Sequence, residues 1–199
     1  MKKSIFLLTF YFLWTSCSST NYIYENKTQR IGVNFREGRW LLNEIDAPYG
    51  VEKKLNEIAL QDFTSLLANR VIRIADAKDI LLERKTALNP NTKDLKNLKI
   101  GTNFDYFINI KARNTKNNLG VISLTNHNYK DSNETNNNEV VLEIYDLNRL
   151  EIIFSQKVIA SSKILENSSS DVHFTKSSNA IIIKSYKKLI KDLSKKSIK

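Results

Sequence analysis

The stretch VEKKLNEIALQDFTSLLANRVIRIA, residues 51–75, carries the clearest structural signal in the sequence. Apolar residues recur along its first part at steps of three and four, which is the period of one helix face. They include Val51, Leu55, Ile58, Ala59, Leu66 and Leu67. The alternating segment that follows is typical of a strand. We therefore expect a helix over residues 51–67 that packs one stripe on a sheet, and then a strand over residues 70–75.

A second alternating segment precedes this helix. In RIGVNF, residues 30–35, every second residue from Ile31 is apolar or aromatic, which predicts a strand. Parallel strands need a crossover of this size, so strand, helix and strand are expected to form a βαβ unit. The apolar run Trp-Leu-Leu, residues 40–42, lies in the loop expected over residues 36–46. We expect it to fold back into the core; the alternative is an exposed contact site.

The second half of the chain predicts an antiparallel meander with flanking helices. Short helices are expected at residues 77–88 and 92–98, the second capped by Thr92. The strands are expected at residues 104–112, 119–125, 139–146 and 150–161, with a polar loop at 126–138. The last two strands flank a short turn and should form a hairpin. The fold class is therefore α/β (α+β), a mixed sheet of about five to six strands with a βαβ start, an antiparallel meander and flanking helices.

The last helix, expected over residues 178–193, carries the most concentrated charge in the chain. Ser177 or Ser178 is expected to cap it, and its apolar stripe comprises Ile182, Tyr186, Leu189 and Leu193. The lysines outside this stripe include Lys184, Lys187, Lys188 and Lys191. They are a candidate surface for a protein partner or an anionic headgroup. The alternative is the solvated side of an ordinary amphipathic helix.

The opening residues 1–20, MKKSIFLLTFYFLWTSCSST, have the order of an export signal. Lys2 and Lys3 form a positive head, residues 5–14 are apolar except for Thr9, and small residues follow. The apolar run is too short to span a bilayer, which takes about 20 apolar residues. The sequence therefore predicts export, with residues 1–16 as the signal peptide.

The one cysteine of the chain, Cys17, follows directly after this signal. Residues 13–17, LWTSC, resemble the lipobox of bacterial lipoproteins, in which cleavage exposes a cysteine that carries acyl chains such as palmitate. Trp14 departs from that pattern, where an aliphatic residue is usual. We expect Cys17 to be the lipid-attachment site, residues 17–29 a lipidated tether, and residues 30–199 a single domain; the alternative is an idle thiol. Ser18 in the second mature position favours the outer over the inner membrane.

The formal net charge of +10 suits an anionic lipid surface or an acidic polymer better than nucleic acid. The basic side of the last helix lacks the interleaved aromatic residues on which single-stranded nucleic acid would stack. We therefore expect no nucleic-acid partner.

No pattern in the chain predicts catalysis, a metal or a cofactor. The two histidines, His127 and His173, lie in polar surroundings without further ligands at a suitable spacing. Glu44 and Asp46 lie near Trp40, but one loop carries both, and we expect them to be solvated rather than to converge on a glycan. Asp105 is expected to be a solvent-facing strand residue. The chain is thus predicted not to be an enzyme.

Two phrases resemble the CsgG/LpoB/TolB-N group of periplasmic domains. Ile100-Gly101 with residues 105–108, DYFI, is similar to the phrase that enters the first meander strand of that group. Residues 146–155, DLNRLEIIFS, resemble its recurrent hairpin. The resemblance covers about residues 30–195 and implies a sheet with flanking helices, a lipoprotein, and partner binding without catalytic residues. The polar segment 113–138 departs from pore-forming members, whose membrane hairpins need alternating apolar residues.

Together these features predict a membrane-anchored, non-enzymatic lipoprotein of the bacterial envelope. Its partners are expected to be the lipid bilayer, through acylated Cys17, and another envelope protein that it assists in assembly, secretion or peptidoglycan synthesis. The alternatives are an oligomeric secretion or pore component and an envelope enzyme acting on glycan. The outer membrane is favoured as its location, with the domain in the periplasm or at the cell surface.

Overall fold

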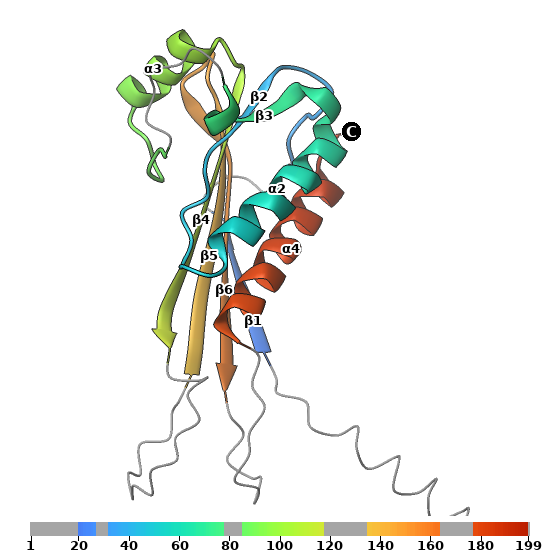
Figure 1. Ribbon diagram of the computed structural model, residues 1–199. Helices are drawn as coiled ribbons and strands as arrows, with labels where there is room; N and C mark the ends of the chain where they lie inside the picture. Colours follow the sequence, from blue (N-terminus) through green and yellow to red (C-terminus); the bar gives the residue numbers. More distant parts are fainter. Residues whose placement is uncertain (1–19, 27–31, 78–84, 118–134, 164–176, 199) are drawn as a thin grey trace, which may run out of the picture.

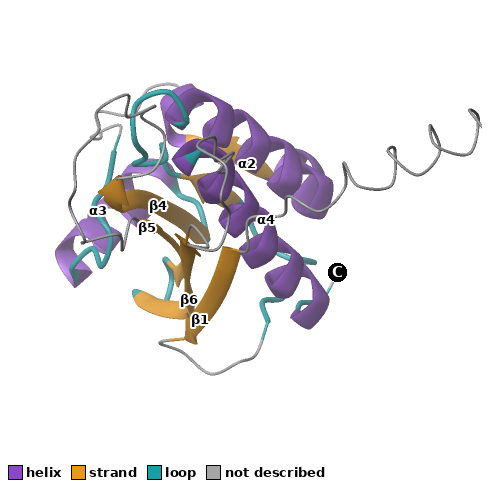
Figure 2. Ribbon diagram, turned by 90° about the horizontal axis from the view of Figure 1, so that it is seen from below, coloured by secondary structure: helices purple, strands orange, loops and turns teal. Residues whose placement is uncertain are grey.

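The computed structural model describes residues 20–26, 32–77, 85–117, 135–163 and 177–198. Within them, one mixed sheet of six strands has the order β1-β6-β5-β4-β2-β3. Helices α2 and α4 cover one face of this sheet, and α3 lies on the other side near one end (Figures 1 and 2). This arrangement confirms the predicted α+β class and mixed sheet.

The strands are β1 (Thr20–Asn26), β2 (Trp40–Leu42), β3 (Val71–Arg73), β4 (Tyr106–Asn117), β5 (Thr135–Asp146) and β6 (Glu151–Lys163). The helices are α2 (Glu52–Leu67), α3 (Thr92–Thr102) and α4 (Ser178–Lys196). Strand β2 is parallel to both β3 and β4, and the remaining pairs are antiparallel. The hairpin β5–β6 and the long helices therefore agree closely with the predicted elements.

The predicted βαβ unit exists, but its first strand is β2 rather than residues 30–35. All three side chains of β2 are fully buried, because its two faces contact two different clusters of apolar residues. Such a strand has no polar side and shows no alternation. The expectation of a loop over residues 36–46 was therefore wrong for β2, whereas its expected place in the core is confirmed.

Residues 32–35 pack against the end of the chain instead of forming a strand. Val33 and Phe35 are buried, yet the backbone makes one isolated parallel bridge, between Asn34 and Ile198. Phe35 N–H donates to the Ile198 carbonyl at 2.9 Å, and Ile198 N–H donates to the Val33 carbonyl at 3.1 Å. The alternation seen in the sequence thus reflects a buried connection.

The expected tether over residues 17–29 differs from the structure at residues 20–26, which form the edge strand β1. It pairs with β6 from Thr20 opposite Ser162 to Asn26 opposite Gln156. Only Tyr22 of this strand packs against the main core, so β1 has no continuous apolar side. Residues 20–26 show no strand pattern in the sequence, because β1 depends on the open edge of the longer β6.

Other expected elements shift or fall outside the described residues. The expected helix at 77–88 lies mostly outside them, and the described residues 85–88 are not helical. The strand expected at 119–125 lies outside as well. The loop expected at 126–138 is described only from Thr135, where the chain already belongs to β5. Helix α3 is capped by Asn91 in a capping box with Asp94, one residue before the expected cap.

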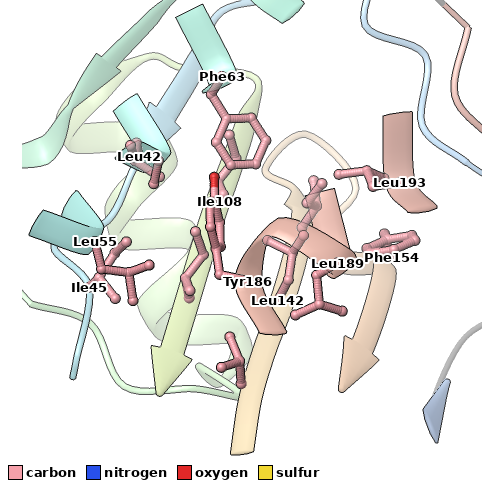
Figure 3. Close-up of a cluster of buried hydrophobic side chains, with 14 of the residues drawn as sticks. Leu42, Ile45, Leu55, Phe63, Ile108, Leu142, Phe154, Tyr186, Leu189 and Leu193 are labelled. Atoms are coloured by element: carbon pink, nitrogen blue, oxygen red, sulfur yellow. The ribbon is translucent and has the colours of Figure 1, made fainter. Parts of the chain in front are cut away.

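The main apolar core lies between the sheet and the pair of helices α2 and α4 (Figure 3). Ser177 caps α4 as expected, its hydroxyl accepting from Ala180 N–H. The predicted stripe of α4 is fully buried, and it comprises Ile182, Tyr186, Leu189 and Leu193. A second, smaller core joins α3 to the other face of the sheet. The sheet is therefore covered along one face and only near one end of the other.

Asp105, just before β4, joins three segments that are distant in the sequence. Its carboxylate accepts hydrogen bonds from Arg39 N–H at 2.9 Å and from Asn148 Nδ2 at 3.2 Å. Lys99 Nζ of α3 lies 3.2 Å from the same carboxylate. Asp105 precedes β4, so the expectation of a strand residue was wrong, whereas its side chain does reach solvent with 32% of its surface exposed. Burial raises the pKa of Asp105, but the hydrogen bonds from these three partners outweigh it and lower the pKa below its usual value.

Gly32 is expected to be intolerant of any side chain. A Cβ atom at this position would lie 2.2 Å from the backbone carbon and oxygen of Lys196. Gly32→Ala should therefore push the end of α4 away and lower the free energy of unfolding by about 1–3 kcal/mol, measured by urea denaturation. Gly101→Ala, in the exposed last turn of α3, is the matched control and should leave stability unchanged or slightly higher. Equal stability of the two variants would contradict this packing.

Asp105→Asn should destabilise the fold at neutral pH by about 1–3 kcal/mol, because charge-assisted hydrogen bonds are lost. The lowered pKa means that the Asp105 carboxylate stabilises the fold above its unfolded pKa and loses this effect as pH falls through its folded pKa. The difference between wild type and variant should therefore shrink below about pH 4. Urea denaturation across pH measures it, with Glu57→Gln on the exposed side of α2 as the control. A difference that is independent of pH would contradict this role of Asp105.

Candidate functional site

Helix α4, which carries the predicted lysines, lies beside the edge strand β1 (Figures 1 and 2). Lys184, Lys188 and Lys191 follow one another at steps of four and three, so they share one side of the helix. Lys188 Nζ is 4.5 Å and Lys184 Nζ is 5.8 Å from the centre of the Tyr22 ring. Both distances are within the range of a cation–π contact. The ring of Tyr22 thus links the lysine row to β1.

Lys187, three residues after Lys184, borders the same lysine side of α4 in the direction of α2. Its charge acts on Asp62 of α2, so it lies toward the groove between the two helices. The four predicted lysines therefore do not form one uniform row. We use "the β1–α4 edge" for the set Tyr22, Ile23, Tyr24, Lys184, Lys188 and Lys191.

The positive charge of this edge is not neutralised within the part of the chain that the structure describes. Helix α4 contains six lysines and one acidic residue, Asp192. Asp192 pairs with Lys196 and accepts a hydrogen bond from Gln156 Nε2 at 2.8 Å. Burial raises the pKa of Asp192, but these partners outweigh it and lower the pKa below its usual value. Lys184, Lys188 and Lys191 have no acidic partner among the described residues.

The strand side of the edge presents exposed aromatic and aliphatic surface. Ile23 is 59% and Tyr24 is 42% exposed, and Tyr22 is half-buried beneath the lysines. Partial burial raises the pKa of Tyr22 and Tyr24, so both phenols are neutral at physiological pH. The edge therefore combines free cations with neutral amphipathic rings. Sequence periodicity identified its lysines, whereas it did not identify the strand that carries the tyrosines.

The opposite face of the sheet holds a second candidate site. Here a hollow of about 320 Å³ lies between residues 87–89 and strands β1, β4, β5 and β6. Its charged lining is mixed in sign and comprises Glu25, Lys111, Arg113, Glu139 and Lys157. Several of these charges are already paired, since Lys157 contacts Glu25 at 2.7 Å and Lys111 contacts Asp46. The hollow therefore offers little unsatisfied charge to a ligand.

Residues 85–90 are fastened across this face by buried polar side chains. Asn43 Nδ2 donates to the Thr86 carbonyl at 2.7 Å, and Asn109 Nδ2 donates to the Ala87 carbonyl at 2.8 Å. The carboxylate of Glu143, which is fully buried, accepts from Asn89 N–H at 3.1 Å and from Tyr145 Oη at 2.6 Å. The side chains of Asn43, Asn109 and Glu143 therefore serve to hold residues 85–90 against the sheet.

The remaining residues considered for chemistry do not converge. Asp46 pairs with Lys85 at 3.0 Å and with Lys111, and its hydrogen bond from Lys111 lowers its pKa. Glu44 lines a different hollow from Asp46. The two carboxylates are therefore not placed on either side of one substrate, as a glycosidase requires.

Three residues that the sequence singles out lie beyond the part of the chain that the structure describes. Cys17, His127 and His173 lie outside the described residues. Within those residues, no three His, Cys, Asp or Glu side chains gather in a way that could hold a metal ion. None of the described helices is both long and apolar enough to cross a membrane.

Comparison with known proteins finds similarity in structure but not in sequence. No protein-family model matches the chain, and no curated protein matches it. The solved structures similar to it include a single-residue variant of the PelC dodecamer from Paraburkholderia phytofirmans, with 10% identity and a TM-score of 0.50 over 87% of this chain and 98% of that one. They also include the lipoprotein GNA1162 from Neisseria meningitidis, with 9% identity and a TM-score of 0.42 over 80% and 99%. At this level of identity, the likeness to PelC shows a shared fold and nothing about function.

Proposed function

We propose that this chain is a lipid-anchored, non-enzymatic protein of the bacterial cell envelope whose domain docks on another envelope protein. The observation that carries the proposal is the position of Cys17, directly after a basic head, an apolar run and two small residues. Several acyl chains on this residue would each contribute about 0.8 kcal/mol per buried methylene, which is enough for stable anchoring where a single chain is not.

The position of β1 supports a domain held close to its membrane. Only Ser18 and Ser19 separate Cys17 from Thr20, the first residue of β1. Three residues of extended chain span at most about 10 Å, so the folded domain begins almost at the lipid surface. The proposed tether is therefore much shorter than residues 17–29.

A protein partner would meet the end of the domain that lies away from the anchor. Helix α3 is at the opposite end of the sheet from Thr20 (Figure 1). Ile100 of α3 is 72% exposed at this end, which leaves it accessible to a partner away from the lipid. We propose this end as the docking surface of the partner.

A second candidate function is an oligomeric component of an envelope assembly. The observation that favours it is that PelC, which shares this fold, is described as a dodecamer. Light scattering of the detergent-solubilised protein separates the two candidates: a monomer supports the docking function, and a closed ring supports the oligomeric one.

The anchor can be tested with Cys17→Ala in cells. Mass spectrometry should find the wild-type amino terminus at Cys17 with added acyl mass, and the variant should carry none. In detergent phase separation, the wild type should enter the detergent phase. The matched control, Ser18→Ala, should behave as the wild type. A wild-type protein with a bare thiol, or with an uncut amino terminus, would contradict the proposed anchor.

A further inference from the structure

We infer that the β1–α4 edge lies on the anionic headgroups of the membrane that holds Cys17. This inference rests on the proposed lipid anchor and adds an orientation to it. The domain then lies along its edge strand, with the lysine side of α4 next to the lipid, instead of standing upright on the end of the sheet.

The length of chain before the domain brings this edge to the lipid. Thr20 is within about 10 Å of Cys17, and Tyr22 and Tyr24 follow directly in the same strand. Strand β1 is one of the two edge strands of the sheet, so the molecule needs only to tilt for this edge to reach the surface.

The lysines of the edge suit a layer of lipid phosphates, and the two acidic residues near them, Glu25 and Asp192, are each paired with a lysine. Lys184, Lys188 and Lys191 share one side of α4 and have no acidic partner among the described residues. A lysine at an anionic bilayer surface strengthens binding by a factor of about five. Cation–π contacts with Tyr22 hold Lys184 and Lys188 beside the strand. These two lysines are therefore held at a fixed position beside β1, where they can contact lipid phosphates.

The apolar part of the edge suits the same environment. Tyrosine is enriched where a membrane meets water, because its ring is apolar and its hydroxyl is polar. Ile23 is 59% and Tyr24 is 42% exposed at this edge, on opposite sides of β1. Headgroups and the first carbons of the lipid chains would cover both.

The backbone of β1 also needs a cover. Proteins usually protect a free edge strand with lysine, proline or a bulge, because it otherwise pairs with strands of other chains. The seven residues of β1, TNYIYEN, include no lysine or proline, and the β1–β6 register is regular. A membrane surface along this edge keeps other strands away.

A second copy of the chain fits this edge less well. Antiparallel pairing of two β1 strands would put the two Cys17 residues at opposite ends of the pair. It would also bring two unneutralised lysine rows together. Two molecules anchored in one membrane therefore have difficulty pairing in this way, whereas lipid meets no such obstacle.

The test uses the acylated protein in vesicles of phosphatidylcholine with or without about 30% phosphatidylglycerol. Since the thiol of Cys17 is acylated, an introduced cysteine is the only one that a fluorophore can label. Ile23→Cys and Lys191→Cys report on the edge; Lys54→Cys on α2 and Lys96→Cys on α3 are exposed controls. Lipids with a nitroxide headgroup should quench the two edge labels at least fivefold more than the controls. This difference should need phosphatidylglycerol and should fall at high salt.

A charge variant makes the test specific. In the Ile23→Cys protein, Lys184→Gln, Lys188→Gln and Lys191→Gln together should reduce quenching to the control level. The matched triple Lys53→Gln, Lys54→Gln and Lys96→Gln, which removes the same charge from other exposed positions, should leave it unchanged.

The outcomes separate the two proposals. Vesicle-bound protein with equal quenching at all positions would overturn the edge contact and leave the anchor intact. Wild-type protein that does not stay with vesicles would overturn both. Disulfide-linked dimers through Ile23→Cys would show a second copy on β1 and would also overturn the lipid contact.

Discussion

The burial of the apolar stripe of α4 is the interaction on which the rest of the structure depends. Tyr186 and Leu189 are completely enclosed between the sheet and α2, as are the neighbouring members of the stripe (Figure 3). Because a helix has a fixed period, burying this side forces the lysine side outward. The same packing delivers Ile198 to its bridge with Asn34. One helix thus closes the core, presents the positive charge and completes the buried connection at residues 32–35.

Much of the fold could be predicted from periodicity, and the failures have a common cause. Helices α2 and α4 and the hairpin β5–β6 each have one apolar and one polar side, so the spacing of their apolar residues predicts them. Strand β2 is buried on both sides and β1 is mostly exposed on both, so neither alternates. Sequence periodicity reveals helices and strands that have one buried and one exposed side. It does not reveal strands whose two sides are both buried or both exposed.

The candidate site shows the same limit. The lysines of α4 were predictable, since they occupy the side of a helix opposite its apolar stripe. Their contact with Tyr22 was not, because the two segments are far apart in the chain and meet only through the register of β1 on β6. Asp105 is similar: its partners Arg39 and Asn148 are 66 and 43 residues away. Its acidic side chain alone gave no indication that it joins three segments.

The contact between residues 32–35 and the carboxyl-terminal end has a consequence for biosynthesis. Val33 N–H donates to Ser197 Oγ at 2.9 Å, and the two residues are 164 positions apart in the sequence. Strand β1 likewise pairs with β6, which follows it by more than 100 residues. Contacts of such long range form slowly and require nearly the whole polypeptide to be present. The nascent chain therefore cannot close this fold before α4 and Ile198 have been synthesised. Until then, the polypeptide lacks the long-range contacts that make this domain compact.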